Sequence, residues 1–225
     1  YLLFFDVRER RLMGSFFESH QEEISDVKFH PHNPDVLASG SIDGLINVFD
    51  CKQESEEDAL QFSLNTCDSV QKIKWHQRNV ISCITNTNDV LIYNTDSQDL
   101  LKKWQRSEIT ESMKRKSVID CNVIDCFDIG DEMMFLGSSN YNKGECLRSL
   151  KFNDTELTPL ANFNGNSQII RASLYNEKKN MYITFGENAI ISVWTEGSSL
   201  SASSAQNLKE DSSINKKIKK KSNPY

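Results

Sequence analysis

The amino-acid sequence lacks the short motifs of the common enzyme classes. It contains no glycine-rich phosphate-binding loop, no GxSxG nucleophile elbow and no HExxH zinc motif. No two carboxylates stand at a spacing typical of a catalytic acid and base. These absences count against the enzyme classes that use such motifs, so we expect a protein that is not an enzyme and that needs no cofactor.

Long apolar runs and closely spaced cysteine pairs are also missing. No segment approaches the roughly 20 apolar residues that a membrane-spanning helix needs, and "YLLFF" at the start is too short for the apolar region of a signal peptide. None of the six cysteines forms a CxxC pair, and the closest two, Cys121 and Cys126, do not have a usual zinc-site spacing. We therefore expect an intracellular protein with reduced cysteines, no bound metal and no membrane partner.

The net charge of −6 is unevenly distributed along the chain. From Gly197 onward, six lysines against two carboxylates give +4, which leaves −10 for residues 1–196. Because phosphate binding needs clustered lysine and arginine, this acidic body argues against a large nucleic-acid interface. Nucleic acid is expected to contact the chain only through its basic C-terminal tail.

What the sequence does contain is a repeat. Phe5, Phe49 and Tyr93 each close an apolar run, and they follow one another at intervals of 44 residues. Trp194 closes a further run, and counting back 44 residues reaches Leu150, beyond an insertion around residues 107–120. A period of 40–45 residues is that of a four-stranded propeller blade.

The strands predicted for one repeat are residues 24–29, 36–41, 45–49 and 59–64. Asp43-Gly44 predicts a tight type I′ hairpin turn, and residues 51–58 are predicted to form a loop. No long amphipathic helix separates the strands, so the sheets are predicted to be antiparallel. A β-sandwich is the alternative to a propeller.

The resulting prediction is an all-β fold with about four blades' worth of a β-propeller. Residues 1–17 supply two strands of a partial blade, blades of four strands follow at about 24–66, 69–105 and 122–163, and a last blade with three predicted strands spans about 168–195. Residues 196–225 are rich in serine, asparagine and lysine with almost no bulky apolar residues. Such a segment buries too little apolar surface to offset its ordering entropy, so it is predicted to be disordered.

The stretch "ASGSIDGLINVFD" resembles a WD40 repeat. In that family a histidine, a turn aspartate, a serine or threonine and a tryptophan form a structural hydrogen-bond network. The resemblance implies that His20, Asp43 and Ser39 (or Ser41) are the members here, with Phe49 lacking the N–H of a tryptophan. In the last repeat the resemblance implies a network of Thr184 and Trp194.

Several motifs together are similar to one subfamily, that of WD repeat-containing protein 89 and its fungal relatives. They are "VKFHP", "SGSIDGLINVFD", "EEDAL" and the final "GENAIISVW". The resemblance implies a propeller of about seven blades that acts as an interaction scaffold without enzymatic activity. Since this chain has 17 predicted strands against about 28 for seven blades, and begins with Tyr1, we expect a C-terminal fragment; closure as four blades is the alternative.

The leading hypothesis is a non-enzymatic scaffold that binds protein partners. A candidate interaction loop for a basic partner or a cation carries four carboxylates, the alternative being a solvated loop that keeps the protein soluble; they are Glu54, Glu56, Glu57 and Asp58.

The second hypothesis is a nuclear RNA-associated or ribosome-assembly factor that uses the basic tail. The run "KKIKKK" is typical of a nuclear-localisation signal and also of non-specific RNA contacts; its lysines are Lys216, Lys217, Lys219, Lys220 and Lys221. We therefore expect the nucleus rather than the cytoplasm.

A metal-dependent hydrolase is a third hypothesis, based on His30 and His32. His30 recurs as His76 one repeat later, after the same strand aromatic. Repeat-equivalent residues fall in separate blades, so the pattern indicates a structural role, and only His32 is left as a ligand candidate.

Overall fold

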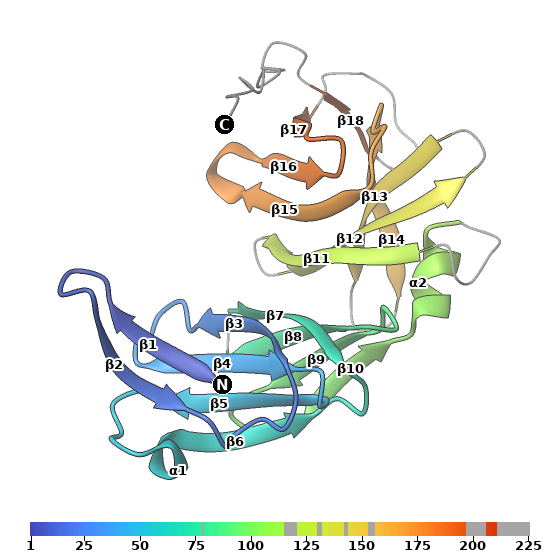
Figure 1. Ribbon diagram of the computed structural model, residues 1–225. Coiled ribbons are helices and arrows are strands. Elements are labelled where there is room, and N and C mark those ends of the chain that lie inside the picture. Colours follow the sequence, from blue (N-terminus) through green and yellow to red (C-terminus); the bar gives the residue numbers. More distant parts are fainter. Residues whose placement is uncertain are drawn as a thin grey trace. The chain divides into compact units, whose positions relative to one another are not determined.

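A computed structural model of the protein describes residues 1–77, 79–114, 121–129, 132–141, 144–152, 156–196 and 206–210. Its regular structure consists of strands with a few short helices (Figure 1). The chain divides into two compact units, Tyr1–Arg106 and Ser107–Tyr225. The predicted all-β fold built from blades is confirmed in both units.

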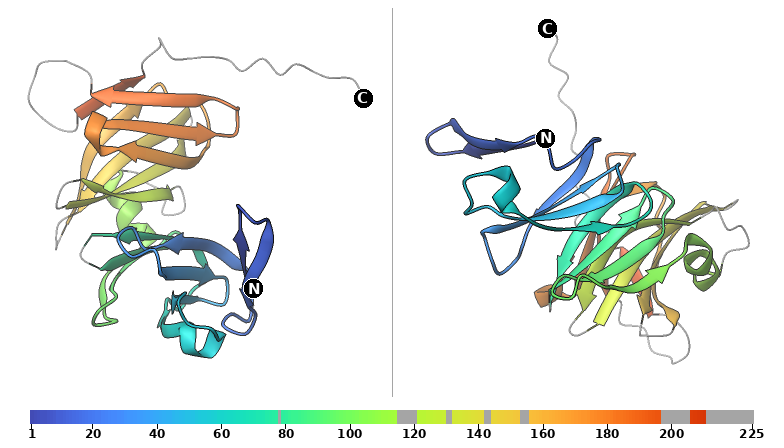
Figure 2. Two further views of the ribbon diagram at one scale, coloured as in Figure 1. Left: turned by 90° about the vertical axis from the view of Figure 1, so that its left-hand side faces the viewer. Right: turned by 90° about the horizontal axis from the view of Figure 1, so that it is seen from below.

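The first unit begins with a two-stranded sheet of β1 (Leu2–Asp6) and β2 (Arg11–Phe16), and the turn between them projects away from the next sheet (Figure 2). Two four-stranded antiparallel sheets follow, each with its strands in sequence order. The first comprises β3 (Ile24–Phe29), β4 (Val36–Ser41), β5 (Leu45–Asp50) and β6 (Leu60–Asn65). The second comprises β7 (Val70–His76), β8 (Val80–Thr85), β9 (Val90–Asn94) and β10 (Leu100–Trp104).

The second unit contains an eight-stranded sheet made of two sets of four strands. The first set comprises β11 (Cys121–Ile129), β12 (Glu132–Tyr141), β13 (Gly144–Phe152) and β14 (Leu157–Asn164). The second comprises β15 (Ile170–Asn176), β16 (Met181–Gly186), β17 (Ile191–Glu196) and β18 (Gln206–Glu210). A parallel pairing of β14 with β18 joins the two sets.

Strand β18 lies inside the segment 196–225 that was predicted to be disordered. It pairs with β14 on one side and with β17 on the other. The prediction considered only side-chain burial, whereas a strand also forms because its backbone satisfies the open edges of its neighbours. The other residues of this segment after Glu196 lie outside the described part of the chain.

Three short helices connect strands in the described part of the chain. Helix α1 (Glu56–Ala59) takes the place of the end of the predicted loop before β6, helix α2 (Arg106–Ser112) lies in the predicted insertion, and the 3-10 helix η1 (Glu177–Lys179) precedes β16. The loop prediction missed α1 because it did not weigh Ser55, whose side chain accepts a hydrogen bond from the N–H of Asp58 and so caps the helix.

The 44-residue interval marks equivalent positions in the structure. Phe49, Tyr93, Leu150 and Trp194 lie in β5, β9, β13 and β17, the third strand of each four-strand set, and all are at most 4% exposed. Phe5 in β1 is 60% exposed, since its sheet has only two strands. The periodicity therefore identified a core position that recurs from blade to blade.

The central strands of the first unit are buried on both faces. Strands β4, β5, β8 and β9 show nearly continuous burial instead of alternation, as expected for a sheet that is covered on each side. One face of the β3–β6 sheet packs on the β7–β10 sheet through a shared core that includes Ile46, Val48, Ile73 and Ile81. The other face packs against Leu2 and Phe16 of the β1–β2 hairpin.

Hydrogen bonds reinforce this contact between neighbouring sheets. Oδ2 of Asp26 in β3 accepts from the N–H of Ile73 in β7 at 3.1 Å, and the indole N–H of Trp75 donates to the carbonyl of Lys28 at 3.1 Å. Because both bonds join strands β3 and β7, the polar groups at the contact are paired where the sheets meet.

The turn between β4 and β5 differs from the predicted type I′ turn. Only Gly44 has a positive φ, of 85°, and its N–H donates to the carbonyl of Ser41. A type I′ turn requires positive φ at both central residues. The connection instead spans Ile42–Gly44, with the left-handed residue last, which glycine adopts without a side-chain penalty.

Gly40→Ala is predicted to destabilise the first unit. A Cβ atom at Gly40 would lie 2.5 Å from Cγ1 of Val70 and 3.0 Å from Cγ2 of Ile73, both of which are buried. Overpacking of this kind costs about 1–3 kcal/mol, and urea denaturation of the full chain should show a loss of that size. Gly14→Ala is the matched control because no atom lies within 4 Å of its added methyl group; equal losses in both variants would contradict the packing argument.

Candidate functional site

His20 links three parts of the first four-stranded blade. It lies between β2 and β3, with its side chain only 2% exposed. Its Nδ1 donates to Oδ2 of Asp43 in the β4–β5 turn at 3.0 Å, and its Nε2 lies 2.7 Å from Oγ of Ser39 in β4. A carboxylate only accepts, so Nδ1 carries the hydrogen and, in the neutral ring, Nε2 accepts from the serine hydroxyl. The structure thus brings together three residues that the resemblance singled out.

The carboxylate of Asp43 is held by further donors. Oδ2 also accepts from the N–H of Gln21 at 3.1 Å, and Oδ1 accepts from the N–H of Leu45 at 2.9 Å. Burial raises the pKa of Asp43, but the hydrogen bonds from Leu45, His20 and Gln21 outweigh it and leave the pKa below its ordinary value of 3.8. The group is therefore ionised at neutral pH and fixes the turn to the segment before β3.

Thr184 and Trp194 form the corresponding pair in the last blade. The indole N–H of Trp194 donates to Oγ1 of Thr184 at 2.8 Å, and both side chains are completely buried. Phe49 occupies the tryptophan position in the first complete blade and is equally buried, but it has no N–H. The family's four-residue network is thus divided, with the histidine part in one blade and the tryptophan part in another.

A similar link in the next blade was missed by the sequence argument. Oδ2 of Asp68, which precedes β7, accepts from Oγ1 and the N–H of Thr87 in the β8–β9 turn, at 2.5 Å and 3.3 Å. Here the aspartate lies in the segment before the first strand and its donor lies in the turn, the reverse of His20 and Asp43. Thr87 stands 44 residues after Asp43, so the repeat interval pointed to it although the residue type did not.

The last blade makes the link with an amide. Nε2 of Gln168, before β15, donates to the carbonyl of Ile190, the last residue of the β16–β17 connection, at 2.8 Å. The side chain of Asn166, two residues earlier, donates to the carbonyl of Gln168 within its own segment. The amide of Gln168 is the one that joins the two loops.

Glu56 in the candidate interaction loop is used inside the protein. Its Oε2 accepts from the N–H of Phe17 at 2.6 Å, and its Oε1 accepts from the N–H of Glu18 at 2.9 Å and of Ser19 at 2.7 Å. The hydroxyl of Ser19 donates to Oε1 as well. One carboxylate therefore fixes the backbone that leads from β2 to His20.

The other three carboxylates of the loop are exposed. Oδ2 of Asp58 accepts from Oγ of Ser55 at 2.6 Å, whereas Glu54, before the short helix, and Glu57, in its first turn, are exposed acidic side chains. The structure therefore does not assemble the four residues into one binding group.

Glu56→Gln is predicted to lower the free energy of unfolding by about 1–3 kcal/mol, because an amide offers one acceptor oxygen and points its NH₂ at backbone donors. Urea denaturation measures the loss. Glu57→Gln removes the same charge from a neighbouring exposed side chain and should leave stability within about 0.5 kcal/mol.

Stability against pH gives a second measure of the same effect. Burial raises the pKa of Glu56, but hydrogen bonds from the Ser19 hydroxyl and from three backbone N–H groups outweigh it and place the pKa below the ordinary 4.5. The stabilisation is present above pH 4.5 and is lost as the pH falls through the folded pKa, since the unfolded chain then binds more protons. As the pH is lowered, the free energy of unfolding should decrease less in Glu56→Gln than in the parent protein. An equal decrease in both proteins would contradict the role assigned to Glu56.

His30 and His32 do not form the predicted ligand pair of the hydrolase hypothesis. Nδ1 of His30 accepts from the N–H of His32 at 3.2 Å and of Asn33 at 3.0 Å, and its ring packs against Trp75 with centroids 4.7 Å apart. Among the described residues no group of three or more potential ligands is arranged to hold a metal ion. His76 likewise serves its own blade, with Nε2 2.7 Å from Oγ of Ser82.

The lysine run of the tail, Lys216 to Lys221, lies outside the described residues. All six cysteines are described, and none of them forms a disulfide bond. Cys83, Cys121 and Cys126 are buried as expected for reduced core cysteines, whereas Cys67 is exposed. No helix in the described part of the chain has the length and apolar character needed to cross a bilayer.

Comparison with known proteins gives consistent results at low sequence identity. The chain is 27% identical over 189 residues to the uncharacterized WD repeat-containing protein YNL035C of Saccharomyces cerevisiae, covering 81% of this chain and 46% of that protein. It is 23% identical to the uncharacterized WD repeat-containing protein C63.06 of Schizosaccharomyces pombe, covering 83% and 60%. It is 24% identical to the WD repeat-containing protein 89 homolog of Dictyostelium discoideum, covering 100% and 64%.

The chain thus spans between about half and two thirds of the length of these relatives. No protein-family model matches it. A chain in the crystal structure of the mitotic checkpoint complex has the same fold, with a TM-score of 0.59 at 13% identity over 81% of this chain and 52% of that one. The curated relatives of the chain are WD repeat-containing proteins, as the sequence resemblance predicted, and its fold is that of WD40 β-propeller blades.

Proposed function

We propose that the protein is a non-enzymatic WD-repeat scaffold that binds protein partners through the loops at the ends of its blades. The observation that carries the proposal is the fixing of these loops by side chains. Three such links hold connecting segments in place. His20 bonds Asp43 and Asp68 bonds Thr87, and in each pair the segment before a blade is joined to a turn of that blade. Glu56 bonds the backbone of residues 17–19. Loops held on a rigid frame are the usual place for binding residues in folded proteins.

The relatives support this proposal at the level of architecture, because they too are WD repeat-containing proteins. A propeller blade offers a buried core that tolerates little change and connecting loops that tolerate much. Partner identity therefore rests with the exposed side chains of the loops.

Affinity purification of the full chain from cells should recover at least one protein in stoichiometric amount that also binds the purified chain directly. The control bait is Ile46→Asp, which places a carboxylate at a completely buried position between two sheets and abolishes the packed blade. A scaffold partner should be lost with this bait.

Proteins that still bind the Ile46→Asp bait bind the C-terminal tail or unfolded polypeptide, and they do not support the scaffold function. Recovery of no protein that needs the intact blades, in extract and with purified components, would contradict the proposal. Lys52, in the loop after β5, is an exposed site for a cross-link to such a partner.

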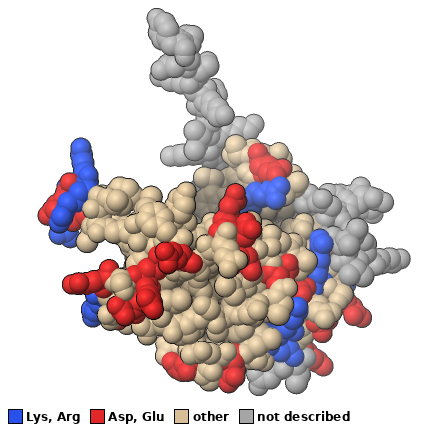
Figure 3. Space-filling model, turned by 60° about the horizontal axis from the view of Figure 1, so that its bottom comes forward, with Lys and Arg blue, Asp and Glu red and all other residues tan. Residues whose placement is uncertain are grey.

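The basic tail favours a second candidate function, a nuclear RNA-associated or ribosome-assembly factor. On the face shown in Figure 3, lysine and arginine side chains form small separate groups among carboxylates. A phosphate backbone attracts clustered positive charge, and the five lysines of residues 216–221 are the densest such cluster in the sequence. The same run supports import into the nucleus.

Removal of residues 197–225 is predicted to abolish retention on RNA at moderate salt. With five lysines engaged, the logarithm of the binding constant should fall with the logarithm of salt concentration with a slope of about −3 to −4. A tail of the same composition in scrambled order should keep RNA retention, whereas replacing the five lysines by glutamine should remove it. Unchanged retention after removal of the tail would rule this function out.

A further inference from the structure

A groove of about 520 Å³ lies between the first two complete blades, where the β3–β6 and β7–β10 sheets end. Its walls come from the turn between β3 and β4, the start of the β5–β6 connection, the turn between β7 and β8 and the residues after β9. The groove and both sheets lie within the first compact unit, Tyr1–Arg106. Pockets that bind small ligands commonly have volumes of about 300–1,000 Å³.

The floor of the groove is apolar. It is formed by Val36, Val48, Phe62 and Trp75, of which Val48 and Trp75 also belong to the core between the two sheets. Trp75 is 8% exposed, and its indole N–H is already bonded to the carbonyl of Lys28. What the indole offers to the groove is therefore ring surface, against which an aliphatic chain or a cation can pack.

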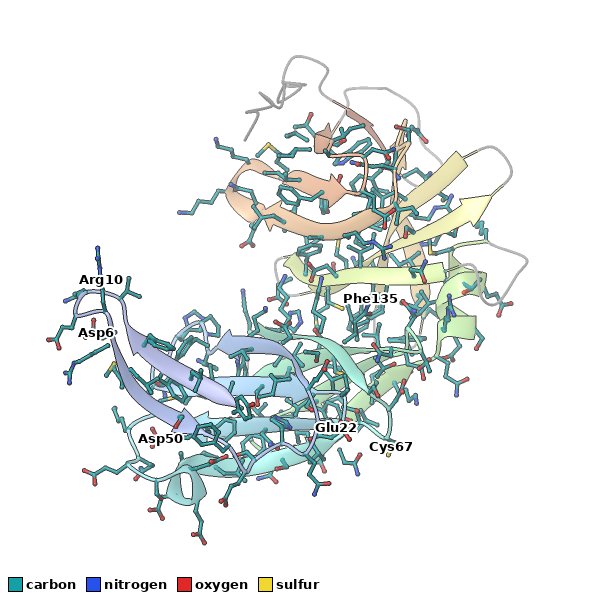
Figure 4. The ribbon with its side chains drawn as sticks, viewed as in Figure 1. Asp6, Arg10, Glu22, Asp50, Cys67 and Phe135 are labelled. Atoms are coloured by element: carbon teal, nitrogen blue, oxygen red, sulfur yellow. The ribbon has the colours of Figure 1, made fainter. Side chains whose placement is uncertain are left out.

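The rim of the groove is negatively charged. Asp35, Asp50 and Asp96 line it together with one cation, Lys52, which gives a net charge of −2 with His30 counted as neutral. Lys52 is paired with Asp35, its Nζ lying 2.7 Å from Oδ2. The excess negative charge thus belongs to Asp50, which Figure 4 labels at the end of β5, and to Asp96.

These two carboxylates are positioned before any ligand binds. Oδ1 of Asp50 accepts from the N–H of Lys52 at 3.0 Å, and its Oδ2 accepts from Nε2 of Gln53 at 3.1 Å. The hydrogen bonds from Lys52 and Gln53 lower the pKa of Asp50. The side-chain amide of Asn79 bonds both oxygens of Asp96, at 3.1 Å and 3.2 Å. Each carboxylate oxygen can accept more than one hydrogen bond, so donors from a ligand can still be accommodated.

We propose that this groove binds an arginine or lysine side chain of a partner protein's peptide segment. The aliphatic part of such a side chain lies on Trp75 and Phe62, and its cationic group bonds Asp50 and Asp96 at the rim. Long cationic side chains combine an apolar stem with a charged end, which is the arrangement that this floor and rim complement. The proposal rests on the proposed scaffold function and names the chemistry of one partner contact.

A displayed library of random dodecapeptides, selected on the purified full chain, tests the proposal. The enriched peptides should contain arginine or lysine next to apolar residues. One enriched peptide, synthesised with a fluorescent label, is then titrated against the parent protein and its variants. The double variant Asp50→Asn/Asp96→Asn should bind roughly tenfold more weakly, because it removes the excess negative charge without changing side-chain shape.

Two further variants test whether the charge of the groove determines the affinity for the peptide. Lys52→Gln makes the groove more negative and should tighten binding. Asp99→Asn removes a charge only three residues from Asp96 but outside the groove, and should leave the affinity unchanged. Equal melting temperatures, within about 2 °C, would show that the variants are folded. Replacing the basic residue of the labelled peptide by citrulline should reduce binding to the level of the double variant.

The absence of any enriched peptide, enrichment of peptides without basic residues, or equal affinity of the parent and the double variant would each overturn the proposal. Such a failure leaves the scaffold function testable on its own, because a partner recovered from cells that still binds Asp50→Asn/Asp96→Asn uses another surface. If the parent chain itself recovers no partner that requires folded blades, the result would instead count against the scaffold function.

Discussion

The packing of one blade on the next is the constraint on which the rest of the described structure depends. A sheet that is covered on both faces needs apolar side chains in both directions, and β4, β5, β8 and β9 accordingly show nearly continuous burial. The same contact requires Gly40, because a Cβ atom there would collide with β7. It also places Asp26 and the indole of Trp75 where they bond across the boundary. Where the two sheets end, packing stops and the groove between them opens.

A second constraint acts on the connections. In three blades the segment before the first strand is linked by a side chain to the hairpin between the second and third strands, by His20 and Asp43, by Asp68 and Thr87, and by Gln168 with the carbonyl of Ile190. The residue types differ and the donor and acceptor exchange places, yet the two loops are joined each time. An unpaired polar group at a loop held against a packed blade costs free energy. What each blade requires is therefore that the two loops are bonded, and different pairs of residues can make the bond.

This freedom explains what could be predicted from the sequence. The 44-residue interval identified Phe49, Tyr93 and Trp194 because this core position accepts only large apolar side chains, which therefore recur at a regular spacing in the sequence. The His20 network was predicted because its residues match a family pattern. Asp68 and Gln168 match none, and Glu56 bonds a backbone 37 to 39 residues away that contributes no side-chain signal. Strand β18 likewise depends on open backbone edges, which composition does not express.

The same division between core and connection determines where recognition can occur. The buried side chains of the blades are closely packed against one another, and a substitution there disturbs two sheets at once. At the rim, Asp50 and Asp96 bond only their own turn and the neighbouring one, so their charge remains directed to solvent. Carboxylates that the turns already hold in place lose little conformational freedom when a ligand arrives, and less binding energy is spent on ordering them. Rigid blades therefore do more than support the loops, because they hold the charged groups of the loops in place for a partner before it binds.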